Sequence, residues 1–300
     1  MTSQECLEIF EKYLREDKHA SKNTLESYMR DIRQLSDYLE ASCGCSLDKA
    51  SSQDIEDYID YLHFQNKSPA TVSRIVASVK CFYFHFSIRG IVKVNPSLSI
   101  KPEKVDEKLP QILTGEEIDL LLRQPKCVDA KGYRDHAMLE TMYATGMRVS
   151  ELLALNVTDV NLSAQLIRCA DGSKERLIPM YPEAVKALEQ YMHLVRGQMV
   201  LSPDENALFV NVSGSRMSRQ GFWKIIKFYA KSAGIEKDIT PHTLRHSFAT
   251  HLLENGADKH SLKELLGYSD VSSAGFYTKL ISNNLSSIYN KAHPRAATAV

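Results

Sequence analysis

The sequence predicts a mainly α-helical protein with one small β-hairpin or sheet, divided into two domains. Apolar residues recur at helical spacing through most of the chain. Residues that favour strands are confined to two short runs, 166–169 and 176–180, around Asp171 and Gly172, a dipeptide that favours a tight hairpin turn. A length of 300 residues with 43% hydrophobic side chains is sufficient for two domains.

The first hundred residues are expected to form a bundle of four amphipathic helices. Asn23 and Glu26 have the spacing of a capping box at a helix start. Ser68 followed by Pro69 is typical of another helix start. Apolar residues follow these signals on one helical face, as in the series Leu25, Tyr28, Met29, Ile32, Leu35 and Leu39. We therefore expect a helical domain over residues 1–100.

A linker and a second domain are expected after residue 100. Residues 95–110 lose the helical period and contain three prolines and alternating charges, so residues 101–110 are interpreted as a linker. Thr114 and Glu117 then form a second capping-box pair, and residues 131–144 are predicted to be a helix that breaks at Gly146. The second domain is expected to span residues 111–300.

The charge of the chain is balanced overall but unevenly distributed. There are 37 basic and 37 acidic residues, so net charge alone gives no reason to expect a nucleic-acid partner. Two long segments, 61–102 and 206–235, nevertheless contain no Asp or Glu. These segments can form basic surfaces that bind phosphates, or they can be ordinary solvated helix faces. Their candidate DNA-binding residues are Lys67, Arg74, Lys80, Arg216, Arg219 and Lys224.

Several protein classes have no support in the sequence. No apolar stretch is long enough to span a membrane, and the first ten residues carry acids where a secretory signal carries bases, so we expect a cytoplasmic protein. The six cysteines lack C-x-x-C spacing, which favours reduced thiols. Motifs for nucleotide hydrolysis, dinucleotide binding and the commonest zinc proteases are missing, so we expect no cofactor.

Residues 241–251 contain the highest density of side chains suited to chemistry. His242 and Arg245 lie three residues apart, so on a helix they can offer a proton carrier and a forked guanidinium to one anion. A structural role at a helix end remains an alternative for both. His242 and His246 also have the spacing of two zinc ligands, although Thr243 stands where a zinc hydrolase has its glutamate.

A second arginine follows the glycine break. Arg148 comes two residues after Gly146, and Glu151 is placed three residues further on, where it can hold the guanidinium. This pair can equally be a plain surface ion pair. Tyr268 follows Gly267, and Tyr277 lies nine residues beyond it.

In this order and spacing, Arg148, His242, Arg245, Tyr268 and Tyr277 resemble the motifs of the tyrosine recombinase, or phage-type integrase, family, and most closely its bacterial Xer branch. The segments 174–179 and 293–296 add to the likeness, which covers nearly the whole chain. The resemblance implies a core-binding, DNA-binding domain over residues 1–100 and a catalytic domain over residues 111–300.

The resemblance also implies the reaction and its participants. Tyr277 would attack a phosphodiester to give a 3′-phosphotyrosine, without metal or ATP, while Arg148 and Arg245 clamp the phosphate and His242 assists proton transfer. The partner would be double-stranded DNA with a specific recombination site, gripped by the two basic regions. Assembly would be a homo- or hetero-tetramer, in which the tail after Leu285 docks on a neighbouring subunit, and a sister recombinase and a DNA translocase are further partners.

Two positions depart from the family pattern. Tyr268 stands where most members have histidine, so it can donate a hydrogen bond but cannot carry a proton as imidazole does. The position of the family's catalytic lysine falls on Asp171, and we hypothesise that Lys174 takes over as general acid. These departures leave open a catalytically weakened DNA-binding relative with an architectural or regulatory role. A type IB topoisomerase and a zinc hydrolase are weaker alternatives.

Overall fold

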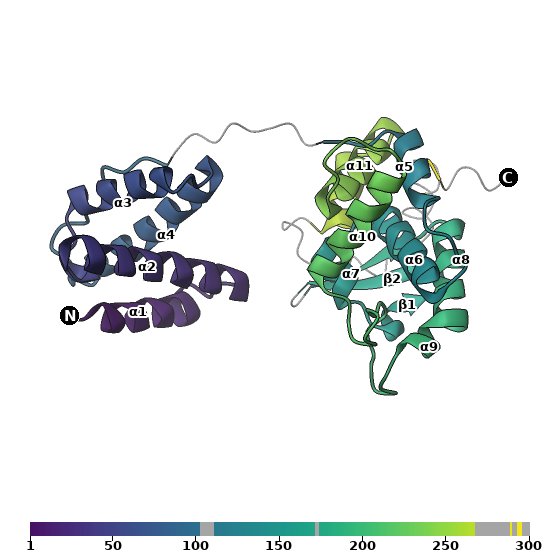
Figure 1. Ribbon diagram of the computed structural model, residues 1–300, viewed down its shortest axis with the longest axis horizontal. Coiled ribbons are helices and arrows are strands. Elements are labelled where there is room, and N and C mark those ends of the chain that lie inside the picture. The colour runs from purple at the N-terminus through teal and green to yellow at the C-terminus, as the bar shows by residue number, and fades with distance from the viewer. Residues whose placement is uncertain (103–110, 172–173, 268–288, 290–292, 296–300) are drawn as a thin grey trace. The chain divides into compact units, whose positions relative to one another are not determined.

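The chain divides into two units, Met1–Lys108 and Leu109–Val300, which are described separately below. The computed structural model describes residues 1–102, 111–171, 174–267, 289 and 293–295. Within this part of the chain, helices predominate and the sheet is small (Figure 1), which confirms the predicted mainly α fold. None of the helices described has the length and apolar character needed to cross a membrane.

Four helices make up the described part of the first unit, residues 1–102. They are α1 (Ser3–Lys12), continued by a π-helical turn at Tyr13–Asp17, then α2 (Lys22–Cys43), α3 (Ser52–Phe64) and α4 (Pro69–Ile88), with a 3₁₀ turn at Leu47–Lys49. Their apolar faces meet in one core, where the ring of Phe82 stacks on Phe86 with centroids 4.2 Å apart and meets Phe10 edge-on at 5.1 Å. Burial of these aromatic faces stabilises the bundle.

The helix starts of the first unit agree with the sequence at one position and differ at another. Ser68 caps α4 by accepting the Thr71 N–H, with Pro69 at the first helical position, as predicted. The prediction that Asn23 and Glu26 start α2 is wrong. Ser21 is the cap because its hydroxyl accepts the Thr24 N–H at 3.3 Å, and Asn23 lies inside the first turn.

The second unit places helices around a three-stranded antiparallel sheet of order β1-β2-β3 (Figure 1). Its strands are β1 (Val160–Asn161), β2 (Leu166–Asp171) and β3 (Lys174–Pro179). Its helices are α5 (Gly115–Leu122), α6 (Ala130–Thr145), α7 (Val149–Ala154), α8 (Pro182–Gln190), α9 (Gly197–Met199), α10 (Arg219–Ser232), α11 (Pro241–Glu254) and α12 (Lys259–Leu266). A 3₁₀ turn at Val157–Asp159 precedes β1, and a π-helical segment at Tyr191–Arg196 continues α8.

The register of β2 and β3 corrects the predicted turn. Asp171 pairs with Lys174, so Asp171 is the last paired residue of β2 and not one of the two central residues of a hairpin turn. Ladder pairing continues inward through Cys169 opposite Arg176 and Ile167 opposite Ile178. This register places Arg176 and Ile178, two residues apart, on the same face of β3.

Helix α6 lies at the centre of the second unit and is buried along most of its length. Residues close to the end of the chain pack against it. The Tyr289 hydroxyl donates to Ala144 O at 2.7 Å, and the His293 ring stacks on Tyr289 with centroids 4.9 Å apart. The expectation that the tail docks on a neighbouring subunit therefore does not hold for these residues, because their aromatic rings are buried in the core of their own unit.

Candidate active site

The first element of the site is the sharp turn between α6 and α7. Gly146 ends α6 in the left-handed conformation, with φ of 57°. A Cβ at this position would lie 2.2 Å from the ring of Phe248, so glycine is required both by the backbone and by the close approach of α11. This turn brings Arg148 to the N-cap position of α7.

Glu151 holds Arg148 from inside the unit, as the sequence predicts. Its Oε2 accepts the backbone N–H of Arg148 at 2.7 Å, and its Oε1 accepts the Arg148 Nη1–H at 2.9 Å. The Glu151 side chain is only 4% exposed, whereas that of Arg148 is 34% exposed. The pair is therefore not a plain surface ion pair, and the guanidinium can meet an incoming anion while its carboxylate partner stays buried.

Arg176 also binds the Glu151 carboxylate, an interaction that the sequence analysis missed. Its Nη1 and Nη2 donate to Oε1 and Oε2 of Glu151 at 3.1 and 2.8 Å, which makes the pair bidentate. Burial alone would raise the pKa of Glu151, but the hydrogen bonds and charges of Arg176 and Arg148 hold this pKa below its usual range. The Glu151 carboxylate is therefore ionised and shared between two guanidinium groups.

Arg245 approaches the same region from α11. Thr240 caps this helix by accepting the Thr243 N–H, and Pro241 occupies the first helical position. The Arg245 side chain is buried and donates from Nη1 to Gly146 O and from Nη2 to Leu266 O, both at 2.7 Å. The structural role left open by the sequence is thus present, since Arg245 links the ends of α6 and α12.

The carbonyls at the end of α12 are where the arginines converge. Arg176 Nε donates to Leu265 O at 2.8 Å, Arg245 Nη2 donates to Leu266 O at 2.7 Å, and Arg148 Nη2 reaches Gly267 O at 3.4 Å. These three consecutive carbonyls form the negative end of the α12 dipole. The geometry therefore gathers Arg148 and Arg245, two of the predicted site residues, immediately before residue 268.

The two histidines of α11 lie on its exposed side. His242 is exposed in the first turn of α11. His246, four residues later and next to the buried Arg245, is exposed as well. Partial burial lowers the pKa of His246, and the neighbouring His242 and Arg245 lower it further. The permanent positive charge of the neighbouring Arg245 favours an anion over a metal cation. Among the described residues, the only three potential metal ligands that lie close together are Cys43, Cys45 and Asp54 in the first unit. The described residues therefore provide no third ligand that would complete a zinc site with His242 and His246.

Of the remaining predicted site residues, only Lys174 lies within the described part of the chain. Tyr268 and Tyr277 lie outside the described residues. Lys174 is the first residue of β3, two residues before Arg176, and it pairs across the ladder with Asp171. The backbone thus places both candidates for the lysine position at the end of the β2–β3 pair where the chain passes from one strand to the other.

The predicted DNA-binding residues differ in their surroundings. Lys67, Arg219 and Lys224 are exposed, and Lys80 is half-buried on α4. Arg74 forms an ion pair with Asp31, a carboxylate only 2% exposed, and also donates to Ser27 Oγ at 2.7 Å. Arg216 donates to the carbonyls of Leu153 and Leu155 at 2.8 and 3.0 Å and so fixes the end of α7. The structure gives Arg74 and Arg216 roles within their own units.

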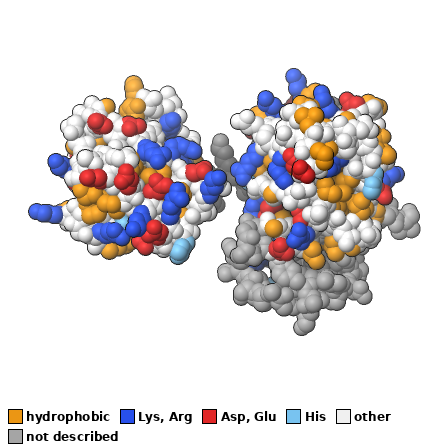
Figure 2. Space-filling model, turned by 90° about the horizontal axis from the view of Figure 1, so that it is seen from below, with side chains coloured by type: hydrophobic (Ala, Val, Ile, Leu, Met, Phe, Trp, Pro, Cys, Tyr) orange, Lys and Arg blue, Asp and Glu red, His pale blue; other side chains and the backbone are white. Residues whose placement is uncertain are grey.

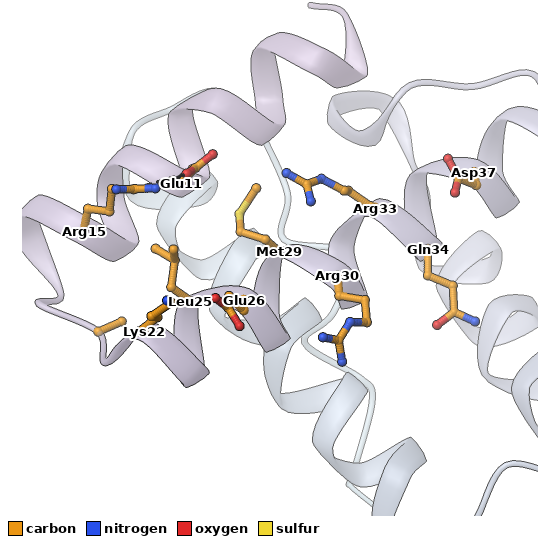
Figure 3. A pocket seen from close by; sticks show the side chains of 11 residues that line it. Glu11, Arg15, Lys22, Leu25, Glu26, Met29, Arg30, Arg33, Gln34 and Asp37 are labelled. Atoms are coloured by element: carbon orange, nitrogen blue, oxygen red, sulfur yellow. Dashed lines mark hydrogen bonds and ion pairs between the residues drawn. The ribbon is translucent and has the colours of Figure 1, made fainter. Parts of the chain in front are cut away.

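A groove in the first unit holds cationic residues that the sequence analysis did not single out. It has a volume of about 950 Å³ and lies along α1 and α2, with Arg30 and Arg33 projecting from α2 (Figure 3). Its other lining residues are Glu11, Arg15, Ala20, Lys22, Leu25, Glu26, Met29, Gln34 and Asp37. Figure 2 shows Lys and Arg side chains gathered on one face of this unit, with acids among them. Because α2 contains acidic residues, it lies outside the two acid-free segments from which the DNA-binding residues were predicted.

Both units of the chain match known protein families. Residues 111–283 match the Phage integrase family, and residues 7–89 match the Phage integrase, N-terminal SAM-like domain. The chain is 44% identical to Tyrosine recombinase XerD of Oceanobacillus iheyensis over 294 residues, covering 97% of this chain and 99% of that protein. It is 39% identical to Tyrosine recombinase XerD of Staphylococcus epidermidis, with the same coverage of each.

Similar folds occur among solved structures. The Tn1549 transposon integrase in complex with circular intermediate DNA has a TM-score of 0.72 at 19% identity, covering 95% of this chain and 100% of that chain. The XerH site-specific recombinase bound to a palindromic difH substrate has a TM-score of 0.69 at 19% identity, covering 91% of this chain and 80% of that chain. At these identities the likeness concerns the fold.

Proposed function

Because this chain belongs to the phage integrase family and is a site-specific tyrosine recombinase, we propose that Arg148, Arg245, His242 and Tyr277 form its centre for DNA strand cleavage. The observation that carries this assignment is the convergence of the Arg148 and Arg245 guanidiniums on the carbonyls of Gly267 and Leu266. In the chain, Tyr268 follows these carbonyls directly and Tyr277 comes nine residues later.

The chemistry requires help for the nucleophile and for the phosphate. An unperturbed tyrosine with a pKa near 10 is only about 0.1% ionised at neutral pH, so His242 would take the phenolic proton as attack begins. The Tyr277 oxygen forms a bond to phosphorus while the bond to the 5′-oxygen breaks, which leaves a 3′-phosphotyrosine and a 5′-hydroxyl. Attack by another strand's 5′-hydroxyl reverses the step and rejoins the DNA.

Two arginines and two further residues would stabilise the transition state. Arg148 and Arg245 bind the non-bridging oxygens, where charge increases in the five-coordinate phosphate, and removing one such donor costs about 3 kcal/mol in the barrier. Tyr268 would add one hydrogen bond to the phosphate. Lys174, at the first position of β3, would protonate the leaving 5′-oxygen.

The DNA partner is proposed to contact both units through phosphates. Lys67 and Lys80 in the first unit and Arg219 and Lys224 in the second would contribute, and Arg30 and Arg33 of the α2 groove would add to the first unit. Because such contacts release counterions, binding should weaken steeply with salt although the net charge is zero. A shallow salt dependence would contradict this part of the proposal.

We further propose the roles and the assembly that the resemblance implies. Residues 1–100 would bind DNA, residues 101–110 would link the domains, and residues 111–300 would catalyse. The recombinase would act in the cytoplasm as a homo- or hetero-tetramer that joins two DNA sites, together with a sister recombinase and a DNA translocase. Sedimentation of protein with a cleaved site would show whether four subunits assemble.

A suicide DNA substrate tests the assignment of Tyr277. A nicked duplex loses its short 5′-hydroxyl fragment after cleavage, so the covalent adduct accumulates and can be counted on a denaturing gel. A library of duplexes supplies the unknown site. We expect an adduct with the wild type and with Tyr133→Phe, a half-buried tyrosine of the same unit, and no adduct with Tyr277→Phe. An adduct that persists in Tyr277→Phe would refute the assignment.

The role of Lys174 has a separate chemical test. A substrate with sulfur in place of the 5′-bridging oxygen has a leaving group that needs no protonation. Lys174→Ala should cleave ordinary DNA slowly and this substrate at the wild-type rate, whereas Arg148→Ala should remain slow on both. Cleavage of ordinary DNA by Lys174→Ala at the wild-type rate would show that Lys174 is not the general acid.

A further inference from the structure

Arg176 occupies the centre of the interactions that fix the arginine site. It lies on β3 with its side chain 10% exposed, on the same face as the buried Ile178. An arginine on the apolar face of a strand must have its charge compensated inside the protein. Here the two ends of the guanidinium bind the Glu151 carboxylate, and its Nε–H donates to Leu265 O.

These contacts join Arg176 to both parts of the site. Through Glu151 it restrains Arg148, because the same two carboxylate oxygens accept from the Arg148 backbone and guanidinium. Through Leu265 it restrains the end of α12, the helix whose next two carbonyls meet Arg245 and Arg148. Gly267 has φ of 67°, and a Cβ there would lie 2.7 Å from Arg176 Nη1. The helix end therefore packs directly on the Arg176 guanidinium.

We propose that Arg176 is a positioning residue for strand cleavage, which holds Arg148 and the end of α12 in one fixed arrangement through the shared Glu151 carboxylate. The inference rests on the proposed function of Arg148. Arg176 itself need not touch the scissile phosphate. Lysine cannot replace it, since an ammonium offers no fork that spans both oxygens of Glu151 while donating to Leu265 O.

Arg176→Lys is the direct test, with Arg168→Lys as the matched control. Arg168 lies on the neighbouring strand β2 and forms exposed ion pairs with Asp159 and Glu175 at 2.6 and 3.4 Å. The measurements are the single-turnover rate of adduct formation at saturating protein and the affinity for the same DNA. A displaced Arg148 should slow cleavage by Arg176→Lys about 100-fold with DNA affinity unchanged. Arg168→Lys should match the wild type in both.

Chemical rescue separates positioning from general stability. Arg176→Ala leaves space for a free guanidinium ion beside Glu151, so added guanidinium should restore part of the cleavage rate. Urea has nearly the same shape without the charge and should not restore it. Cleavage by Arg176→Lys at the wild-type rate would overturn the proposal, and so would equal rescue by urea and guanidinium.

A measurement that does not depend on DNA cleavage distinguishes failure of this inference from failure of the proposed function. If the wild type forms no adduct on any duplex, the proposed function fails. Hydrogen exchange of the backbone amides at the end of α12 then tests the inference alone. We expect protection to fall in Arg176→Lys and to persist in Arg168→Lys. Unchanged protection in Arg176→Lys would overturn the inference even if the wild type cleaves DNA.

Discussion

Replacing Glu151 by glutamine should destabilise the second unit strongly, because the carboxylate is buried between two cations. Glu151 accepts four hydrogen bonds, from Arg148 N and Nη1 and from Arg176 Nη1 and Nη2, at 2.7 to 3.1 Å. In Glu151→Gln, an amide NH₂ replaces one oxygen and faces guanidinium donors. Removing one partner of a buried ion pair costs about 3–5 kcal/mol. Because glutamine keeps one acceptor, we expect a loss of about 3 kcal/mol, at the lower end of that range.

The chain provides a convenient probe and a control for this measurement. Its single tryptophan, Trp223, lies on α10, so tryptophan fluorescence follows unfolding of the second unit alone. A loss of about 3 kcal/mol corresponds to a fall of about 6–12 °C in Tm for a unit of this size. In the control Glu175→Gln, an exposed acid on β3 loses an ion pair with Arg168 at 3.4 Å, which costs below about 1 kcal/mol. Equal losses in the two variants would refute the reasoning.

The stability difference between the wild type and Glu151→Gln should also depend on pH. The pKa of Glu151 is lowered in the folded protein, so its contribution is fully present above the ordinary pKa of glutamate. As pH falls below the ordinary pKa, Glu151 binds a proton in the unfolded chain while the folded carboxylate stays ionised. Protonation therefore favours the unfolded chain, and the stabilising contribution of Glu151 is lost as pH falls through the lowered pKa of the folded protein. The stability difference between the wild type and Glu151→Gln should therefore be constant at neutral pH and shrink in acid. A difference that grows in acid would contradict the lowered pKa.

Three further predictions concern the surrounding structure. Gly146→Ala should lower the Tm of the second unit by more than Gly234→Ala, because both glycines have positive φ but only Gly146 has an aromatic ring, that of Phe248, within 4 Å of an added Cβ. Burial lowers the pKa of His293 to about 3, so the wild type should lose stability relative to His293→Phe as pH falls from about 6.5 toward 3, and identical pH profiles would exclude this effect. Arg216→Ala should lower the Tm of the second unit and leave the salt dependence of DNA binding unchanged, since its guanidinium binds carbonyls of its own unit; a shallower salt slope would show a phosphate contact instead.

Local signals in the sequence predicted the fold well where the interacting groups are close in the chain. The capping box of Thr114 and Glu117 is present because its hydrogen bonds join residues three apart. The start of α2 was misplaced by two residues, because Ser21 and Asn23 are both good caps and packing of the helix decides between them. Glu151 was identified correctly as the partner of Arg148 for the same reason of proximity.

The rest of the site depends on contacts between distant segments. Arg176 and Glu151 are separated by 25 residues, and Arg176 and Leu265 by 89, so the register of β3 and the docking of α12 must be known before these bonds can be foreseen. The sequence did contain one usable signal, an arginine two residues before Ile178 in a predicted strand. A charge on the inward face of a strand indicates a buried partner. Runs of basic residues are less informative, as Arg74 shows by pairing with the buried Asp31.

The fixed positions of the guanidinium groups would suit the cluster to a phosphoryl transition state. Among the described residues, Arg148 and Arg176 share the Glu151 carboxylate, and Arg245 binds the nearby carbonyls of Gly146 and Leu266. The carbonyls at the negative end of α12 accept hydrogen bonds from all three guanidiniums and hold them in place before any substrate arrives. A phosphodiester brings one negative charge, and attack by a phenolate adds a second on the same oxygens. In the proposed mechanism, the attraction is therefore stronger in the transition state than in the bound substrate, and this difference would accelerate cleavage.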